Sequence, residues 1–319
     1  MLTATIAPRS EYRSEKVCIN VNRSTSLSRR QRQIFTSIFF LAPTFILLGI
    51  FMFYSIYSSF SLSLLNWDGI TPNREYVGLA NWRALLGDRS FLLALGNNIK
   101  VVILSLVVQM PIAMALAFFL SHHHGKGAAT LKVLWALPLM MSSVAVGFLW
   151  KNMYDPNFGL FNAILRFFGH RPVAFLGDPK TALYSVIATI CWQYIPFYML
   201  YFIAGFSSLP VEVHDAALID GATEGQYLFR CAIPMMSPTI KNACILSIVG
   251  SLKYFDLILA MTEGGPSGAS NLMATYMYRI SFWEVRLSYG STVASAMFII
   301  ITVLSLSLTY LLNRRDNLA

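Results

Sequence analysis

Residues 209–238 read LPVEVHDAALIDGATEGQYLFRCAIPMMSP, and this stretch decides how the rest of the chain is interpreted. It is polar and helix-patterned, yet it lies between two hydrophobic runs, 182–206 and 243–261, that are long enough to cross a bilayer. A polar insert of this kind between two membrane spans indicates a docking element. The residues alone leave a second interpretation open, an amphipathic hairpin that rests on the membrane face.

The first half of the insert carries the signals of a short helix. Pro210 suits a first helical position, and Ser207 and Ser208 just upstream are candidate N-caps. Gly221 is placed to end this helix. We therefore predict a helix from Pro210 to the residues before Gly221.

The second half carries a capping box. Thr223 is followed three residues later by Gln226, so a second helix is predicted to start there. We expect this helix to stop at Pro234, because proline lacks the backbone donor that a helix interior needs. The predicted product is a compact helix–turn–helix unit.

Small residues lie between charges on the first of these helices. Ala216 and Ala217 are flanked by Asp215 and Asp220. Small side chains let another surface approach closely, and the carboxylates fix its register. This arrangement favours insertion of the unit into a groove of a partner.

The same residues carry a specific family resemblance. Asp215-Ala216-Ala217, Asp220-Gly221-Ala222, Phe229, Ile233-Pro234 and Pro238 resemble the cytoplasmic coupling loop of permease subunits from binding-protein-dependent ABC importers, with Asp215 where the family usually has glutamate. Two further motifs, Ser251-Leu252-Lys253-Tyr254-Phe255-Asp256 and Thr262-Glu263-Gly264-Gly265-Pro266, look like the fifth-helix signature of the sugar-importing branch, which includes the maltose-type permeases.

The resemblance implies a function in import and a set of partners. It implies a second, homologous permease subunit, two ATPase subunits, an extracytoplasmic solute-binding protein and a saccharide substrate. It implies no cofactor on this chain, since ATP and Mg are used by the partner ATPases. The residues that it implies for ATPase coupling are Glu212, Asp215, Ala216, Ala217, Asp220, Gly221 and Ala222.

Composition supports a membrane protein independently of the resemblance. Hydrophobic residues make up 56% of the chain and charged residues only 12%, whereas soluble domains are about a quarter charged. The mean hydropathy is +0.57. A spanning helix needs about 20 largely apolar residues, and the runs that qualify or nearly qualify are 35–62, 98–120, 133–154, 182–206, 243–261 and 288–312.

Basic residues set the predicted orientation, because they concentrate in short cytoplasmic segments. Six of them precede Arg32 in the N-terminal arm, and Arg314 and Arg315 follow the last run. The chain is therefore predicted in a bacterial inner membrane with both termini on the cytoplasmic side, which agrees with an even number of spans. This placement accounts for much of the net charge of +9 without a nucleic-acid partner.

The predicted fold class is an all-α membrane protein with six transmembrane helices and a cytoplasmic coupling-helix loop between the fourth and the fifth. The predicted divisions are a basic cytoplasmic tail at 1–33, a permease domain at 34–313 with the coupling loop at 207–238, and a short C-terminal tail at 314–319.

The sequence argues against a nucleotide site or a metal site. Gly125-Lys126-Gly127 lacks the additional glycine of a phosphate loop, because Leu120 stands at that position. The run His122-His123-His124 is not expected to bind a metal, since three consecutive side chains of a regular helix cannot face one ion. The chain is therefore predicted not to be an enzyme.

Polar residues within the predicted spans are candidates for a substrate path. Lys253 and Asp256 are three residues apart on one expected helical face, so they either pair with each other or line a translocation path. Gln193 and Tyr198 flank Pro196 in the fourth span, where a kink would open a cavity. These four side chains are the predicted path residues.

Three function classes follow from these observations. The first is a permease subunit of an ABC saccharide importer, the second an ion-coupled secondary sugar transporter that titrates Lys253 and Asp256, and the third a membrane enzyme, for which no nucleophile or metal constellation is visible. Lys253, with Lys100 and Lys151 toward the outer face, would suit an acidic oligosaccharide such as a uronate or alginate oligomer. The alternative is that all three lysines are structural. Segments 66–97, 155–181 and 264–289 are the expected contacts of the binding protein.

Overall fold

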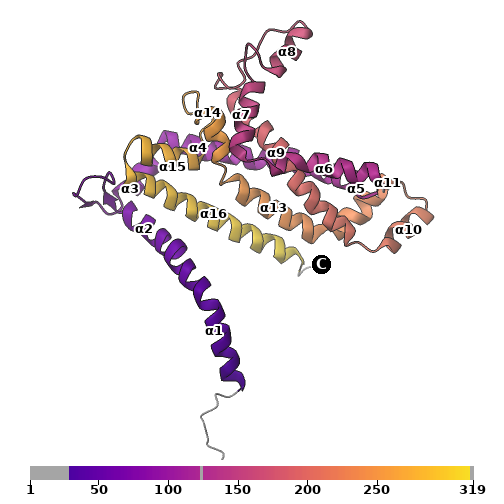
Figure 1. Ribbon diagram of the computed structural model, residues 1–319, viewed down its shortest axis with the longest axis horizontal. Coiled ribbons are helices and arrows are strands. Elements are labelled where there is room, and N and C mark those ends of the chain that lie inside the picture. Colours follow the sequence, from indigo (N-terminus) through magenta and orange to yellow (C-terminus); the bar gives the residue numbers. More distant parts are fainter. Residues whose placement is uncertain (1–28, 123–124, 317–319) are drawn as a thin grey trace, which may run out of the picture. The chain divides into compact units, whose positions relative to one another are not determined.

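The computed structural model describes residues 29–122 and 125–316, and in this part the chain is mostly helical (Figure 1). Two compact units, Met1–Ser55 and Ile56–Ala319, are described separately. The α-helices are α1 (Arg29–Leu48), α2 (Tyr54–Ser63), α3 (Ala80–Leu86), α4 (Arg89–Leu104), α5 (Met110–His122), α6 (Lys126–Met140), α7 (Ser143–Met153), α8 (Leu160–Phe167), α9 (Ala182–Ser207), α10 (Val211–Ile219), α11 (Glu224–Tyr227), α12 (Ile233–Met235), α13 (Ser237–Ser251), α14 (Asp256–Thr262), α15 (Met273–Tyr278) and α16 (Leu287–Asp316).

Short π-helical turns and one small sheet complete the described structure. The turns η1 (Gly49–Phe53), η2 (Ser105–Gln109), η3 (Leu228–Ala232) and η4 (Arg279–Trp283) continue helices that precede them. Strands β1 (Leu65–Asn66) and β2 (Glu75–Tyr76) pair antiparallel, with Leu65 opposite Tyr76.

Four of the described helices are long and apolar enough to cross a membrane. They are Thr36–Ser63, Arg89–His122, Ala182–Ser207 and Leu287–Leu311. The predicted spans 35–62, 182–206 and 288–312 agree with three of them to within one residue. The first described unit consists of α1, η1 and the start of α2, and the expected tail falls largely on residues 1–28, outside the described part.

The predicted second span, 98–120, starts nine residues too late, because the helix begins at Arg89. Asn97 and Asn98, at the predicted start of this span, are both buried inside the bundle. The side-chain amide of Asn97 donates to the carbonyls of Ala269 (2.9 Å) and Asn271 (3.0 Å). Polar side chains are tolerated within the helix because distant backbone groups satisfy them.

The predicted third and fifth spans are wrong as single straight helices. Residues 133–154 fall on α6 and α7, which meet at an angle of 97°. Residues 243–261 fall on the end of α13, a break at 252–255 and the start of α14. A second bent pair, Glu224–Met235 with Ser237–Ser251, turns by 75°, so the described part holds up to six spans only if each bent pair counts as one.

Helix α9 forms the centre of the second unit. Its most apolar window is 61% buried, compared with 33% for α4–α5 and 22% for α16. Ile190, Met199 and Phe202 lie in its core cluster with α5, α7 and α14. A second cluster joins α4, α13, α15 and α16.

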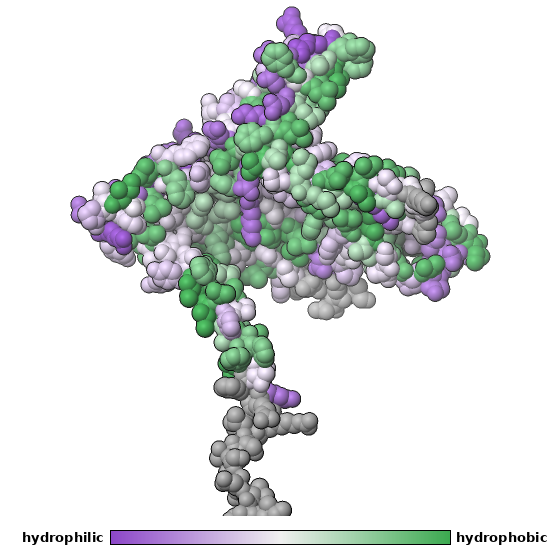
Figure 2. Space-filling view, viewed as in Figure 1, coloured by the Kyte–Doolittle hydropathy of each residue, from purple (hydrophilic) through white to green (hydrophobic). Residues whose placement is uncertain are grey.

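The two ends of this unit differ in structure. The end of α5, the start of α6, α10 and α11 gather at one end, while β1, β2, α3 and α15 lie at the other (Figure 1). Figure 2 shows hydrophilic side chains near α10–α11 and near α8, with hydrophobic surface over much of the face between them. On this face, largely hydrophobic surface therefore lies between the polar insert and the segment around α8 (Figure 2).

Candidate functional site

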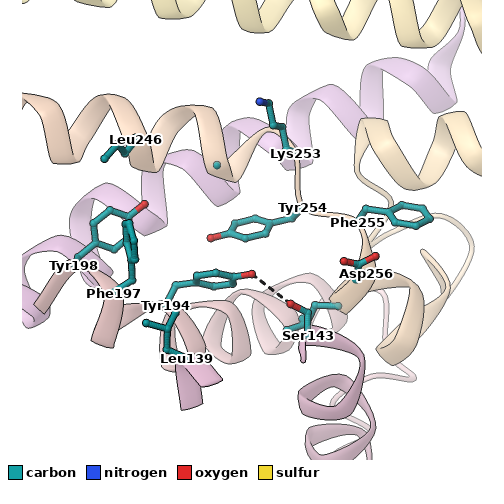
Figure 3. A pocket seen from close by; sticks show the side chains of 12 residues that line it. Leu139, Ser143, Tyr194, Phe197, Tyr198, Leu246, Lys253, Tyr254, Phe255 and Asp256 are labelled. Carbon is teal, nitrogen blue, oxygen red and sulfur yellow. Dashed lines mark hydrogen bonds between the residues drawn. The ribbon is translucent and has the colours of Figure 1, made fainter. Parts of the chain in front are cut away.

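A pocket of about 370 Å³ lies between the bent helix pair α6–α7, the centre of α9 and the break that follows α13. Its size is within the range of small-molecule sites. Three tyrosines, one serine, one lysine and one aspartate supply its polar side chains (Figure 3). The lining side chains include Ser143, Tyr194, Phe197, Tyr198, Lys253, Tyr254, Phe255 and Asp256.

The break after α13 forms one wall of this pocket. The backbone leaves the helix at Leu252, and α14 restarts at Asp256 without a side-chain cap. The side chain of Asn98 donates to the freed carbonyl of Ser251 (3.2 Å), so the helix end is satisfied within protein, as membrane burial requires. The short non-helical segment directs Tyr254 toward α9.

Tyrosine rings from α9 and from the break face each other across the pocket. The rings of Tyr194 and Tyr254 lie 5.2 Å apart at 46°, and the hydroxyls of Tyr194 and Ser143 are 3.3 Å apart. Figure 3 shows Tyr194, Tyr198 and Tyr254 around one space. Aromatic faces next to hydroxyl groups can contact both the apolar faces and the hydroxyl edges of a sugar.

Three of the four predicted path residues share this pocket. Tyr198, Lys253 and Asp256 line it. Gln193 does not: it is 2% exposed, and its amide nitrogen donates to the Met141 carbonyl (3.3 Å) and the Ser143 hydroxyl (3.4 Å). Gln193 thus joins α9 to the bend between α6 and α7.

The expectation that Lys253 and Asp256 occupy one helical face is wrong, because Lys253 lies in the break and Asp256 begins α14. In Figure 3 the lysine side chain points away from the aspartate carboxylate. Both side chains are exposed, and no ion pair joins them in the part of the chain that the structure describes. The remaining two lysines are separate: Lys100 donates to Asn97 Oδ1 (3.3 Å), three turns inside its helix, and Lys151 lines a different pocket.

Tyr194 and Tyr254 are not among the predicted path residues. Tyr254 stands within the quoted motif at 251–256, between the lysine and the aspartate that were predicted for the path. An aromatic residue between a lysine and an aspartate at the end of an apolar run is the signal that could have identified it.

The polar insert folds as the predicted helix–turn–helix unit, with α10 and α11 as its helices. Helix α10 ends in a Schellman motif: the amide of Gly221 donates to Leu218 (3.0 Å), and that of Ala222 donates to Ala217 (2.9 Å). Gly221 has a φ of +80°, as this motif requires. The capping box is also present, with Thr223 N to Gln226 Oε1 at 2.8 Å and Gln226 N to the Thr223 hydroxyl at 3.3 Å.

Two local predictions for this unit were wrong. Pro210 is the N-cap of α10 rather than its first residue, and neither serine caps it. The hydroxyls of Ser207 and Ser208 instead donate to Ile203 (2.9 Å) and Gly205 (2.7 Å) of α9. The second helix runs through η3 and α12 and ends at Met235, one residue after Pro234, so its predicted end is confirmed to within one residue.

The unit has one anchored face and one free face. Val213 and Ala217 pack against the core cluster of α9. The candidate coupling residues Glu212, Asp215, Ala216, Asp220 and Gly221 are exposed, whereas Ala217 and Ala222 are half-buried.

Large apolar side chains accompany the exposed charges. Ile219 is 85% exposed, Phe229 71% and Val211 67%. Exposed apolar groups of this size on a polar element mark an interaction surface. A hairpin resting on the membrane face would also expose apolar groups, so docking into a partner stays a prediction.

Asn162 holds the segment 155–181 in shape. Its buried side chain donates to Asp155 O (3.1 Å) and Val173 O (3.0 Å) and accepts from Val173 N (2.7 Å). The pocket that contains Lys151 lies between this segment and residues 261–266, so two of the predicted outer segments meet there.

Asp88 joins the other two outer segments. Its carboxylate caps α4 by accepting from Ser90 N (2.9 Å) and Phe91 N (3.3 Å), and it also accepts from the hydroxyls of Tyr276 and Tyr289, the latter at 2.7 Å. Burial raises the pKa of Asp88, but these hydrogen bonds outweigh it and hold the pKa below its usual value.

Comparison with known proteins identifies the family of this chain. The family model of the binding-protein-dependent transport system inner membrane component matches residues 109–316. A probable ABC transporter permease of Pyrococcus horikoshii is 31% identical over 88% of this chain and 97% of its own length. The trehalose/maltose transport system permease protein MalF of Thermococcus litoralis is 29% identical, over 85% of this chain and 90% of its own.

A solved structure shares the fold. A chain of a bacterial ABC transporter involved in the import of the acidic polysaccharide alginate superposes with a TM-score of 0.77 at 23% identity, covering 89% of this chain and 96% of that one. At this identity the likeness describes the architecture of the helices.

Proposed function

Because this chain belongs to the family of inner membrane components of binding-protein-dependent transport systems, we propose that it is a saccharide-translocating permease subunit driven by separate ATPases. The membership confirms the resemblance carried by residues 215–238 and places the chain in the membrane as a multi-pass protein. The observation that carries the proposal is the exposed α10–α11 unit in a chain of this family.

Coupling to the ATPases is assigned to α10–α11. Glu212, Asp215, Ala216, Asp220 and Gly221 form its free face, and Ile219 adds apolar area that a groove in an ATPase would cover. The ATPases bind ATP and Mg, and their closure pushes this face toward the bundle. The anchored face transmits the push, since Val213 and Ala217 pack on the core around α9.

The tyrosine-lined pocket is assigned to the saccharide path. Tyr194 and Tyr254 offer ring faces, and Ser143, Tyr198 and Asp256 offer hydrogen-bonding groups. The break at 252–255 is a broken helix in the sense common to transporters, where irregular backbone lines a binding site. A saccharide substrate also agrees with the similarity of this chain to the trehalose/maltose transport system permease protein of Thermococcus litoralis.

The charge of Lys253 points to an oligosaccharide with carboxylates, such as a uronate oligomer. The side chain is exposed at the pocket, and within the described residues it has no ion-pair partner. Lys100 takes no part, because it is engaged with Asn97. One lysine rather than three is thus proposed to select for the acid.

The proposed assembly contains a second homologous permease, two ATPases and a solute-binding protein outside the cytoplasm. Both termini and α10–α11 face the cytoplasm. Segments 66–97, 155–181 and 264–289 face the binding protein, and hydrogen bonds of Asp88 and Asn97 to the third segment support a shared docking face.

The test is an affinity pull-down of the chain from its native membrane, followed by an ATPase assay in liposomes with a panel of saccharides and the co-purified binding protein. Recovery of an ATPase and a second permease, with hydrolysis stimulated by one saccharide class, is the expected result. Recovery of the chain alone, with flux that follows an ion gradient and needs no ATP, would replace this proposal with a secondary transporter.

The acidic substrate has its own test, the variant Lys253→Met with Lys253→Arg as the control that keeps the charge. Uptake of acidic oligosaccharides is expected to fall more than that of neutral ones in Lys253→Met and to be retained in Lys253→Arg. An equal loss on both substrates would remove the charge-matching argument.

A further inference from the structure

Two histidines and a glutamate from three different helices meet at the base of the docking unit. His122 ends α5, His214 lies in α10, and Glu224 begins α11. One ligand-type atom from each lies within 4.8 Å of the others. His214 Nε2 is 3.4 Å from Glu224 Oε1, and His122 Nε2 is 4.0 Å from Glu224 Oε2.

We propose that His122, His214 and Glu224 bind one divalent transition-metal ion of the Zn²⁺ class. Bonds of about 2.0–2.2 Å in a tetrahedral site place ligand atoms about 3.3–3.5 Å apart. The His214–Glu224 separation of 3.4 Å already matches this spacing, the His122–Glu224 separation of 4.0 Å exceeds it, and all three pairs lie within 4.8 Å, so metal binding would draw the histidines closer together. Two histidines and one carboxylate, with one open position, form a known zinc donor set.

The orientation of His122 favours metal binding. Its Nδ1 lies 2.9 Å from the Phe118 carbonyl, so Nδ1 carries the proton and donates it, while the lone pair of Nε2 faces Glu224. A backbone carbonyl on the remote nitrogen is the usual way in which proteins orient a metal-binding imidazole. The rings of Phe118 and Phe206 pack beside it, at 4.2 and 6.4 Å.

The surroundings leave room for a fourth ligand. The cluster opens onto a cavity of about 370 Å³ lined by Ser121, His122, His214 and Tyr227. The hydroxyl of Ser121 is buried and has no hydrogen-bond partner among the described residues. A water molecule on the metal would provide one.

A simple ion pair accounts for only one of the two histidines: His214 Nε2 can donate to Glu224 at 3.4 Å, which leaves His122 Nε2, 4.0 Å from Glu224, without a hydrogen-bond partner among the described residues. The two imidazole rings lie 5.1 Å apart and both face Glu224. If both rings were charged to pair with this one carboxylate, they would repel each other at that distance. A single cation between three lone-pair donors removes the conflict.

The sequence did not indicate this site, because it uses only the first residue of the run His122-His123-His124. The argument that consecutive side chains cannot face one ion is unaffected. His214 and Glu224 come instead from the polar insert, far along the chain. A bound ion would join the end of α5 to both helices of the docking unit, a consequence that rests on the proposed function.

The experiment measures zinc binding directly and is independent of transport. The full-length chain, purified in detergent with a tag that contains no histidine, is dialysed against Zn²⁺ and the bound metal is quantified. One zinc per chain is expected. His214→Gln and Glu224→Gln should each weaken binding at least about tenfold, as loss of ligands or of their supporting groups does elsewhere.

Two controls make the result specific. His170→Gln, at an exposed histidine after α8, should bind as the parent does, and so should the double variant His123→Gln/His124→Gln. Gel filtration and circular dichroism establish that each variant is folded. Zinc that survives His214→Gln but is lost in the double variant would assign it to the histidine run and overturn the proposal, as would the absence of stoichiometric zinc from the parent.

Discussion

A substitution at Gly221 tests whether the turn between α10 and α11 transmits force. Gly221 has a φ of +80°, and a Cβ built on it meets nothing within 4 Å. The cost of a side chain there is therefore conformational and not steric within this chain. An L-residue in the left-handed region costs about 1–2 kcal/mol, which is a factor of about 5–30 in the ratio of the native turn to its other conformations.

Valine and asparagine separate two contributions at this position. Gly221→Val incurs the full conformational cost, and its β-branch makes the left-handed region a genuine outlier. Gly221→Asn adds a side chain but tolerates the left-handed conformation. Saccharide-stimulated ATPase activity of the assembled transporter is expected to fall in Gly221→Val, by at most about 5–30-fold, the limit that this change in the equilibrium ratio sets.

The assay compares the two variants in liposomes at equal permease content. If Gly221→Asn retains activity, the backbone conformation is what coupling needs, whereas loss in Gly221→Asn as well shows that a partner approaches the bare backbone. A Gly221→Val permease that inserts normally and couples as well as the parent would refute the assignment of coupling to this turn.

Three further predictions concern stability of the purified protein, followed as Tm in detergent. Asp88→Asn should lower Tm at neutral pH. Asparagine caps a helix as well as aspartate does, but it lacks the negative charge that accepts hydrogen bonds from Tyr276 and Tyr289 and that is worth about 0.3–1 kcal/mol at a helix N-terminus. Because the pKa of Asp88 is lowered from 3.8 in the fold, its contribution to stability is complete above pH 3.8 and is lost as the pH falls through the lowered pKa. The Tm values of the variant and the parent should therefore converge in acid. A constant difference in Tm at all pH values would contradict this. Gln109→Met should raise Tm, because Gln109 is 0% exposed and neither of its side-chain polar atoms has a hydrogen-bond partner among the described residues. Burying such a group without a partner costs about 1–3 kcal/mol. The control is Gln193→Met, which removes two hydrogen bonds and is expected to lower Tm. Asn162→Ala should leave Tm nearly unchanged but speed proteolysis within residues 155–173, since its three hydrogen bonds hold only that segment; equal cleavage rates would count against the role given to Asn162.

Local signals explain which parts of the fold could be predicted from the sequence. The capping box at Thr223 and Gln226 and the helix end at Gly221 depend on residues a few positions apart, so the pattern was sufficient. The unbroken apolar run of α9 likewise gave its bounds to within one residue. Both predictions rest on chemistry contained within a single helix or turn.

The parts that could not be predicted depend on distant partners. The break after Ser251 is stabilised by Asn98, which lies 153 residues earlier. Without that contact, an apolar run from 243 to 261 is expected to continue as one helix, and Lys253 and Asp256 then fall on one face. Tyr254 enters the pocket only because the break exists, so the site was recognised by its charges and not by its rings.

The Schellman end of α10 separates the shape of the docking unit from its surface. Two backbone hydrogen bonds, to Leu218 and Ala217, define the shape, and they do not depend on the side chains at Asp215, Ala216 or Ile219. Those exposed side chains can change without loss of the turn. If the proposed function holds, several importers in one cell can share the backbone of this docking unit and differ in its exposed side chains. Each permease would then bind its own ATPase and reject the ATPases of related importers.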